Sequence, residues 1–511
     1  MHDIRTLILA LALALLATPG RAQQWNVAET AHFRIYSKGP PAELSRRAAM
    51  LEDYRLLMQA STNRGVIRTA EPRLDIFLVD KMPTSRPFTP MSKLVAGIYL
   101  ATPNRIAAYS DEGDKHDQTT LLHEYAHHFM LGTGGTVAYP AWYVEGFAEY
   151  FSTARFAPDQ IDVGDISDNR ASWLVYSEKW LPLEKVLTAD YSWRSAEQVS
   201  LFYAQSWLLT HYLYRKPELT PKLGAYLAAV ASGEDSVTAF RQHISDNLSA
   251  FQRSMRNYLI NRRLTYTRYS RSAGTPASVR VTALSPAAEP MLLQLANLEF
   301  GVAADKREAA LASVRASAAR FPGDPLAERA LAYADLHYGD RAAAVTRLDT
   351  LIAANPRDAD LLRWRGEAEL PRQAGPVSMA QMKAARTWFG RAFKANPEDW
   401  RTLFLYAMLD NPFAQTMKPQ TLEVLLRAHE LAPQVEEIGL AAAMGLARAG
   451  RLPEAAAKLA PIANAPHGGS IGEAAATLLS LARAGDADAF IAGIDSASST
   501  VTSGDAATDE P

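Results

Sequence analysis

The chain has 511 residues, of which 48% are hydrophobic and 21% are charged. This length and balance are typical of an ordinary globular protein with two or three domains. The formal net charge of −2 gives no reason to expect nucleic acid or an anionic membrane as a partner. The absence of cysteine excludes structural disulfides, thiolate metal ligands and a lipid anchor on cysteine.

The first residues predict a signal peptide at 1–22. A short basic stretch at 1–5 precedes an apolar run at 6–17, and small residues lead up to a cleavage site after Ala22. No later apolar run has the length needed to cross a membrane. We therefore expect no membrane span after cleavage and a periplasmic protein, with secretion as the second possibility.

Residues 23–269 predict a domain of mixed α and β structure. Alternating or continuous apolar patterns predict four strands, at 32–37, 73–79, 96–101 and 105–109. Helical spacing predicts a helix at 42–61 before the second strand and another at 117–131 after the last. Beyond that point the sequence predicts helices alone, at 140–155, 199–214, 220–232 and 237–262.

The helix at 117–131 carries the sequence His123-Glu124-Tyr-Ala-His127, an HExxH pattern. Residues four apart lie on one face of a helix, so both imidazoles can bind one metal ion. Glu124 projects about 100° away, which lets it miss the ion and act as general base on a water beside it. His128 faces away from His127 and is expected to pack or donate a hydrogen bond, and neither His116 nor His211 has a spacing that demands a metal.

A carboxylate helix follows the pattern. Glu145 lies in Trp142-Tyr-Val-Glu-Gly-Phe-Ala-Glu-Tyr150, after a glycine-rich segment that ends the first helix and a proline that starts the second. An antiparallel return of this helix brings Glu145 to the histidines as the third zinc ligand. Glu149, one turn further along, is placed to accept a hydrogen bond from the outer nitrogen of a ligand histidine.

The segments HEYAHH and YVEGFAEYF resemble the gluzincin metallopeptidases, whose third ligand is a glutamate on the helix after HExxH. The resemblance implies Zn²⁺ as cofactor, ligands His123, His127 and Glu145, and Glu124 as catalytic base. It also implies an α+β, thermolysin-like catalytic domain in which a small sheet leads into a helical half. The overall order of segments is similar to the bacterial peptidase MA-like proteins, which join such a domain to helical repeats.

A further segment, Phe202-Tyr203-Ala-Gln205-Ser206, is similar to the start of a helix in aminopeptidase N-type gluzincins. That resemblance makes Tyr203 a candidate oxyanion stabiliser, and the alternative is a buried aromatic residue on an amphipathic helix. Gln205 and Ser206 stand where those enzymes have lysine and glycine. Their amino-anchoring glutamate has no counterpart, because 95–102 and 104–109 contain no acidic residue. The sequence therefore does not support aminopeptidase activity.

The remainder of the chain predicts a linker at 270–289, helical repeats at 290–490 and a disordered tail at 491–511. Prolines 322, 356, 397 and 433 lie 34, 41 and 36 residues apart, with an insertion expected at 370–378. This spacing resembles an all-α tetratricopeptide-like solenoid. Such repeats form either a docking surface for a protein partner or an extension that braces the first domain.

The sequence is compatible with two functions. The first is an exported zinc metallopeptidase that hydrolyses peptide bonds in a peptide or protein substrate, with Glu124 as base. The second is a tetratricopeptide-type interaction module whose metallopeptidase-like domain is a non-catalytic scaffold. Glu124 favours the first, because a scaffold needs at most the metal ligands.

Overall fold

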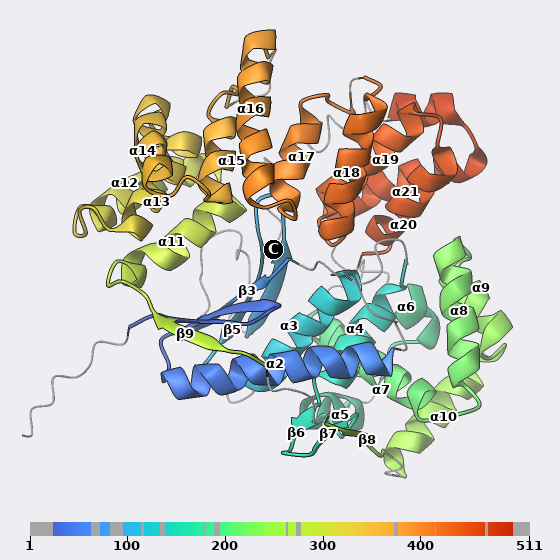
Figure 1. Cartoon of the computed structure of the whole chain (residues 1–511). Helices are drawn as coiled ribbons and strands as arrows, with labels where there is room; N and C mark the ends of the chain where they lie inside the picture. Colours follow the sequence, from blue (N-terminus) through green and yellow to red (C-terminus); the bar gives the residue numbers. More distant parts are fainter. Residues whose placement is uncertain are drawn as a thin grey trace, which may run out of the picture.

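The computed structural model is mostly helical, with a small mixed sheet near its centre (Figure 1). It describes residues 24–62, 72–81, 96–113, 117–132, 138–177, 179–188, 195–261, 264–271, 277–372, 377–413, 415–465 and 469–493. The predicted signal peptide lies outside these ranges, as does the predicted disordered tail from residue 494 on, whereas residues 491–493 of that tail are helical. Within them, no helix is both long and apolar enough to cross a membrane.

The main sheet has six strands in the order β4-β5-β3-β2-β1-β9. The four predicted strands are confirmed as β2, β3, β4 and β5, whereas β1 was not predicted. Parallel pairing joins β3 to β2 and to β5, and the other pairs are antiparallel. The bounds are β1 Asn26–Glu29, β2 Phe33–Ser37, β3 Leu74–Val79, β4 Gly97–Ala101, β5 Ile106–Asp111 and β9 Arg280–Ala283.

Both faces of the sheet are covered. Every residue of β3 is buried, as is typical of a central strand in a layered fold. Leu74, Ile76 and Leu78 join a core that includes α2 (Pro41–Ser61) and α3 (Asp117–Gly132). On the other face, Phe77 and Val79 pack with apolar residues of α11 (Ala288–Phe300). The sheet thus holds α3 in a fixed position from one side and carries the start of the repeats on the other.

The helical half of the first domain follows α3. Helix α4 (Ala141–Phe151) packs against α3 and against α7 (Ala196–Tyr214). The other helices are α5 Asp168–Tyr176, α6 Leu183–Thr188, α8 Thr220–Ser232, α9 Ser236–His243 and α10 Leu248–Ile260. A second sheet of three strands lies among them, with β6 Arg155–Phe156, β7 Gln160–Val163 and β8 Thr267–Ser270.

Three expectations for this half were wrong. The chain after α3 is not helical alone, because β6 and β7 follow α4 and end it at Phe151 rather than at residue 155. The helix predicted at 237–262 is two helices, and the Asn247 side chain caps the second by accepting a hydrogen bond from the Ala250 N–H. The linker predicted at 270–289 contains β9, which pairs with β1 at the sheet edge, and α11 begins at Ala288.

The C-terminal region is a repetitive array of helices, here called the helical array (residues 288–484). It forms an arc beside the sheet and the first domain (Figure 1). After α11, and a short 3₁₀ turn at Ala304–Lys306, its members are α12 Arg307–Ala318, α13 Pro325–Tyr338, α14 Arg341–Ala354, α15 Ala359–Glu367, α16 Met379–Ala395, α17 Trp400–Met408, α18 Pro419–Leu431, α19 Glu436–Arg448, α20 Leu452–Ala463 and α21 Gly469–Ala484.

Prolines 322, 356 and 397 each lie two residues before an aspartate, and this recurring pattern has a structural explanation. Each aspartate is the N-cap of the following helix, with Asp324 before α13, Asp358 before α15 and Asp399 before α17. Their carboxylates accept hydrogen bonds from backbone N–H groups of the first turn, which would otherwise lack partners. The predicted insertion falls between α15 and α16, whose connection lengthens that repeat.

Candidate metal centre

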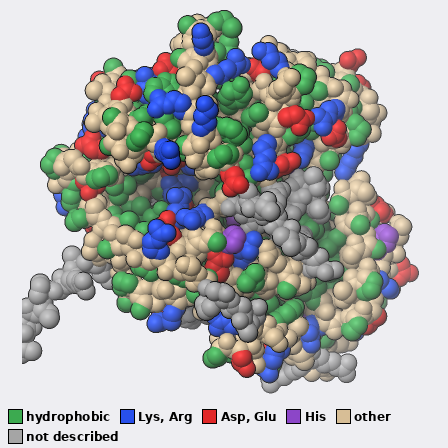
Figure 2. Space-filling model, in the orientation of Figure 1, with side chains coloured by type: hydrophobic (Ala, Val, Ile, Leu, Met, Phe, Trp, Pro, Cys, Tyr) green, Lys and Arg blue, Asp and Glu red, His purple; other side chains and the backbone are tan. Residues whose placement is uncertain are grey.

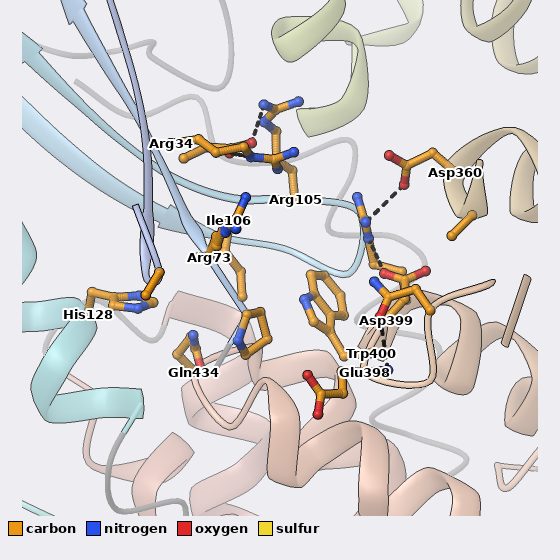
Figure 3. Close-up of a pocket in the computed structure, with 16 residues that line it drawn as sticks. Arg34, Arg73, Arg105, Ile106, His128, Asp360, Glu398, Asp399, Trp400 and Gln434 are labelled. Carbon is orange, nitrogen blue, oxygen red and sulfur yellow. Dashed lines mark hydrogen bonds and ion pairs between the residues drawn. The ribbon is translucent and has the colours of Figure 1, made fainter. Parts of the chain in front are cut away.

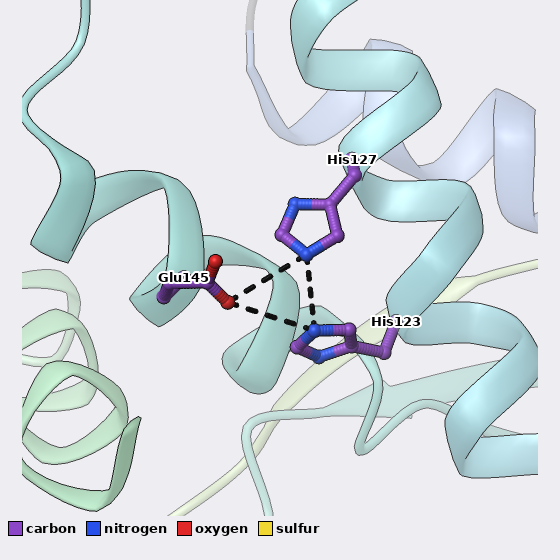
Figure 4. Close-up of side chains that lie close together, drawn as sticks. All are labelled: His123, His127 and Glu145. Carbon is purple, nitrogen blue, oxygen red and sulfur yellow. Dashed lines mark hydrogen bonds and ion pairs between the residues drawn. The ribbon is translucent and has the colours of Figure 1, made fainter. Parts of the chain in front are cut away.

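Three side chains converge between α3 and α4 (Figure 4). His123 and His127 project from one face of α3, with their Nε2 atoms 3.0 Å apart. Glu145, on α4, places its Oε2 atom 3.7 Å from Nε2 of His123 and 3.6 Å from Nε2 of His127. The three predicted ligands therefore lie together, as the antiparallel return of α4 requires.

The spacing of these atoms suits a small divalent ion. A point equidistant from the two Nε2 atoms and Oε2 lies about 2.0 Å from each of them, which matches the usual zinc distances to imidazole and carboxylate. The Glu145 side chain is only 1% exposed, and the histidine side chains are 15% and 13% exposed. A carboxylate this deep is costly unless positive charge compensates it. The donor set thus fits zinc, with the imidazoles nearer to solvent.

Glu149, the residue predicted to accept a hydrogen bond from a ligand histidine, lies beside His123. Its Oε1 atom lies 3.4 Å from Nδ1 of His123, the nitrogen that faces away from the other two ligands. Arg170, on α5, donates from Nε to Oε2 of Glu149 over 2.8 Å and from Nη2 to Oε1 over 2.5 Å. This two-point contact fixes the carboxylate plane and so the orientation of the His123 ring.

Sequence reasoning missed Arg170, because no motif connects α5 to the site. The arginine is largely buried and its guanidinium also lies over the Tyr203 ring, 5.3 Å from the centroid. Burial acts to lower the pKa of Arg170, but the neighbouring Glu149 carboxylate raises it above its ordinary value. Arg170 is therefore a cation at neutral pH.

Glu124 is buried on α3 beside the edge strand β4. Strand and helix approach closely there because residue 97 is glycine: a Cβ atom at Gly97 would lie 2.4 Å from Cγ2 of Thr120 and 3.2 Å from Cγ of Glu124. Gly97, the first residue of β4, thus lets the strand lie directly against the predicted base.

Tyr203 lies near the middle of α7, next to the site. Its ring centroid is 6.4 Å from that of His123, and its ring is half-buried. Gln205 and Ser206, which replace the lysine and glycine of the aminopeptidases, both make packing or hydrogen-bond contacts within this domain. Gln205 pairs with both backbone groups of Leu181, and the Ser206 carbonyl lies against α4 at Gly146. Tyr203 is therefore near the ligands, and both interpretations of its role stay open.

The neighbouring histidines are not ligands in this arrangement. His128 projects about 100° round α3 from His127, where its Nδ1 lies 3.1 Å from the Tyr99 hydroxyl, and burial lowers its pKa to about 4. His211 is fully buried between the Gly164 carbonyl and the Tyr258 hydroxyl, and burial lowers its pKa to about 4 as well. His116 lies outside the described residues.

Comparisons with known proteins leave the site to be judged on its own geometry. No protein-family model matches the sequence, and no curated protein matches it. Among solved structures, the chain is similar to a thermophilic TPR protein of Thermus thermophilus. The two share 24% sequence identity with a TM-score of 0.31, and the match covers 37% of this chain and 97% of the other.

Proposed function

We propose that this protein is a zinc-dependent peptidase that acts after export from the cytoplasm. The observation that carries the proposal is the convergence of His123, His127 and Glu145 at zinc-like spacing, with Glu124 on the same helix as the two histidines. A bound zinc ion would supply Lewis-acid activation of water and of the scissile carbonyl. The three ligands would hold it.

The remaining residues have separable roles in this proposal. Glu124 takes the proton from the attacking water and delivers it to the leaving amine. Glu149 and Arg170 keep His123 in the orientation that presents Nε2 to the metal. Tyr203, whose ring lies near that of His123, would donate a hydrogen bond from its hydroxyl to the developing oxyanion.

A peptide substrate has a natural binding edge. Strand β4 lies at the end of the sheet order, and among the described residues only one of its edges is paired. An extended peptide added to its other edge would form backbone hydrogen bonds and pass beside Glu124, since Gly97 contacts that side chain. The strand offers no carboxylate to hold a free amino terminus, so we propose cleavage that does not depend on that group.

The test uses the conservative variant Glu124→Gln. We expect wild-type protein to contain zinc and to cleave components of an unfractionated peptide mixture, with products identified by mass spectrometry. The variant should retain zinc and lose about 10²-fold or more of this activity, since general-base catalysis contributes on that order. Wild-type protein without zinc, or a variant as active as wild type, would contradict the proposal.

A second function rests on the helical array. Helix α16 exposes two large apolar side chains, Met379 at 74% and Phe393 at 44%. We propose that this helix offers an attachment point for a protein partner. A photo-crosslinker at residue 379 or 393 should capture one defined partner from a periplasmic extract, while a control at Tyr176, 84% exposed on α5, should not. Equal capture at all three positions would oppose this function.

A further inference from the structure

A cavity of about 440 Å³ lies where the helical array faces the ends of strands in the main sheet (Figure 3). Its lining includes none of the three candidate ligands, and it borders α3 at His128, which projects about 100° round the helix from His127. Figure 2 shows acidic and basic side chains gathered along the crease between the two parts of the molecule. One wall comes from β2, β3 and β5 with their preceding loops, and the other from the starts of α15 and α17.

The sheet wall carries arginines with unused donors. Arg34 donates through Nε to Asp75 over 2.6 Å, and among the described residues its terminal amino groups have no hydrogen-bond partner. Arg73 lies 3.3 Å from Glu29 and is 46% exposed. Arg105 is committed to Asp75 and Glu299, so it braces this wall rather than facing a ligand. Arg34 and Arg73 can therefore bind a carboxylate together.

The array wall carries an excess of negative charge. Three carboxylates and one arginine line the cavity on this side, which leaves a net charge of −2: Asp360, Glu398, Asp399 and Arg401. Most of these groups neutralise one another inside the array. Glu398 is the exception, because it is exposed and forms no ion pair with any described residue. Asp360 also lines the cavity, but its carboxylate is paired with Arg363 and Arg401.

We propose that this cavity binds a small zwitterion, an amino acid or short peptide with both ends free. Its carboxylate contacts Arg34 and Arg73, and its ammonium group contacts Glu398. The volume is within the range of small-molecule sites. A ligand of one charge alone would meet attraction at one wall and repulsion at the other, so the opposed walls select for both charges. This site is independent of the proposed peptidase activity.

Calorimetric titration of the full chain with alanyl-alanine tests the proposal, in a Glu124→Gln background that prevents hydrolysis. The acetylated and the amidated dipeptides, which each lack one charge, should bind at least tenfold more weakly. Arg73→Gln should weaken the free dipeptide by a similar factor without further weakening the amide. Glu398→Gln should weaken binding of the free dipeptide by a similar factor. It should not further weaken binding of the acetylated dipeptide, which has no ammonium group.

Matched controls are available on α18. Arg427 and Glu430 form an exposed ion pair and are 46% and 54% exposed, which resembles the setting of Arg73. Arg427→Gln and Glu430→Gln should leave binding unchanged, and all four variants should melt within a degree or two of the parent. The proposal is overturned if the dipeptide does not bind, if it binds as tightly in its capped forms, or if the cavity variants behave like the controls.

Discussion

Replacement of Gly146 by alanine tests whether close packing against α7 positions helix α4, which carries Glu145. Gly146 follows the ligand Glu145 directly and lies where α4 crosses α7. A Cβ atom there would lie 2.2 Å from Oγ1 of Thr210 and 2.4 Å from the backbone oxygen of Ser206. The threonine side chain can rotate away, but the backbone oxygen cannot. The two helices would have to separate by roughly 1 Å to reach ordinary contact distance.

The expected cost follows from that obstacle. Overpacking of a core costs about 1–3 kcal/mol, and the upper part of that range applies when backbone must move. Alanine regains about 1 kcal/mol of helix propensity, so we expect Gly146→Ala to lose about 2 kcal/mol in the free energy of unfolding, measured by urea denaturation. Zinc affinity should fall as well, because Glu145 moves with the helix.

The matched control is Gly390→Ala in α16. A Cβ atom at Gly390 would meet nothing within 4 Å, so this change should stabilise the protein by about 0.5–1 kcal/mol. If Gly146→Ala is as stable as Gly390→Ala, or binds zinc as well as wild type, the close α4–α7 contact is not what positions Glu145.

Three further changes test other parts of the account. Asp324→Ala removes the cap of α13 and should cost about 1 kcal/mol by urea denaturation, whereas the exposed Asp305→Ala should cost almost nothing; equal costs would count against the capping role. Arg170→Gln leaves the buried Glu149 carboxylate without its cation, so it should lose about 1–3 kcal/mol and weaken zinc binding about tenfold in a competitive titration; unchanged affinity would show that Glu149 does not need this support. The pKa of His211 is lowered from 6.5 to about 4, which means that the fold favours the neutral ring and loses stability as pH falls from about 6.5 toward 4. Between pH 7 and pH 5, the free energy of unfolding should therefore fall by roughly 2 kcal/mol less in His211→Gln than in the wild type. The same pH dependence in both proteins would refute this.

The sequence predicted that His123, His127 and Glu145 lie close together, because helix spacing and the residues between the two helices determine this arrangement. His123 and His127 share a face of α3 at a spacing of four residues, and glycine and proline between the helices force α4 to return. Arg170 could not be found in this way. Its contact with Glu149 joins residues 21 apart on different helices, and only the packing of α5 against α7 brings them together.

The missed strands have a similar cause. Strands β1 and β9 have four residues each, and the residues that pair lie more than 240 positions apart in the sequence. Such short segments have little periodicity, and β9 is embedded among serine, alanine and proline residues that indicate a linker. Likewise, helical spacing runs on through 237–262, so the break before Asn247 became visible only in three dimensions.

Metal content is the most direct measure of the central claim, that His123, His127 and Glu145 form a zinc centre. After dialysis against zinc and then buffer, wild-type protein should retain one zinc ion per chain. His127→Ala should retain almost none, while His128→Gln, at the neighbouring position outside the cluster, should retain as much as wild type. Wild-type protein without zinc, or equal loss in the two histidine variants, would contradict the account.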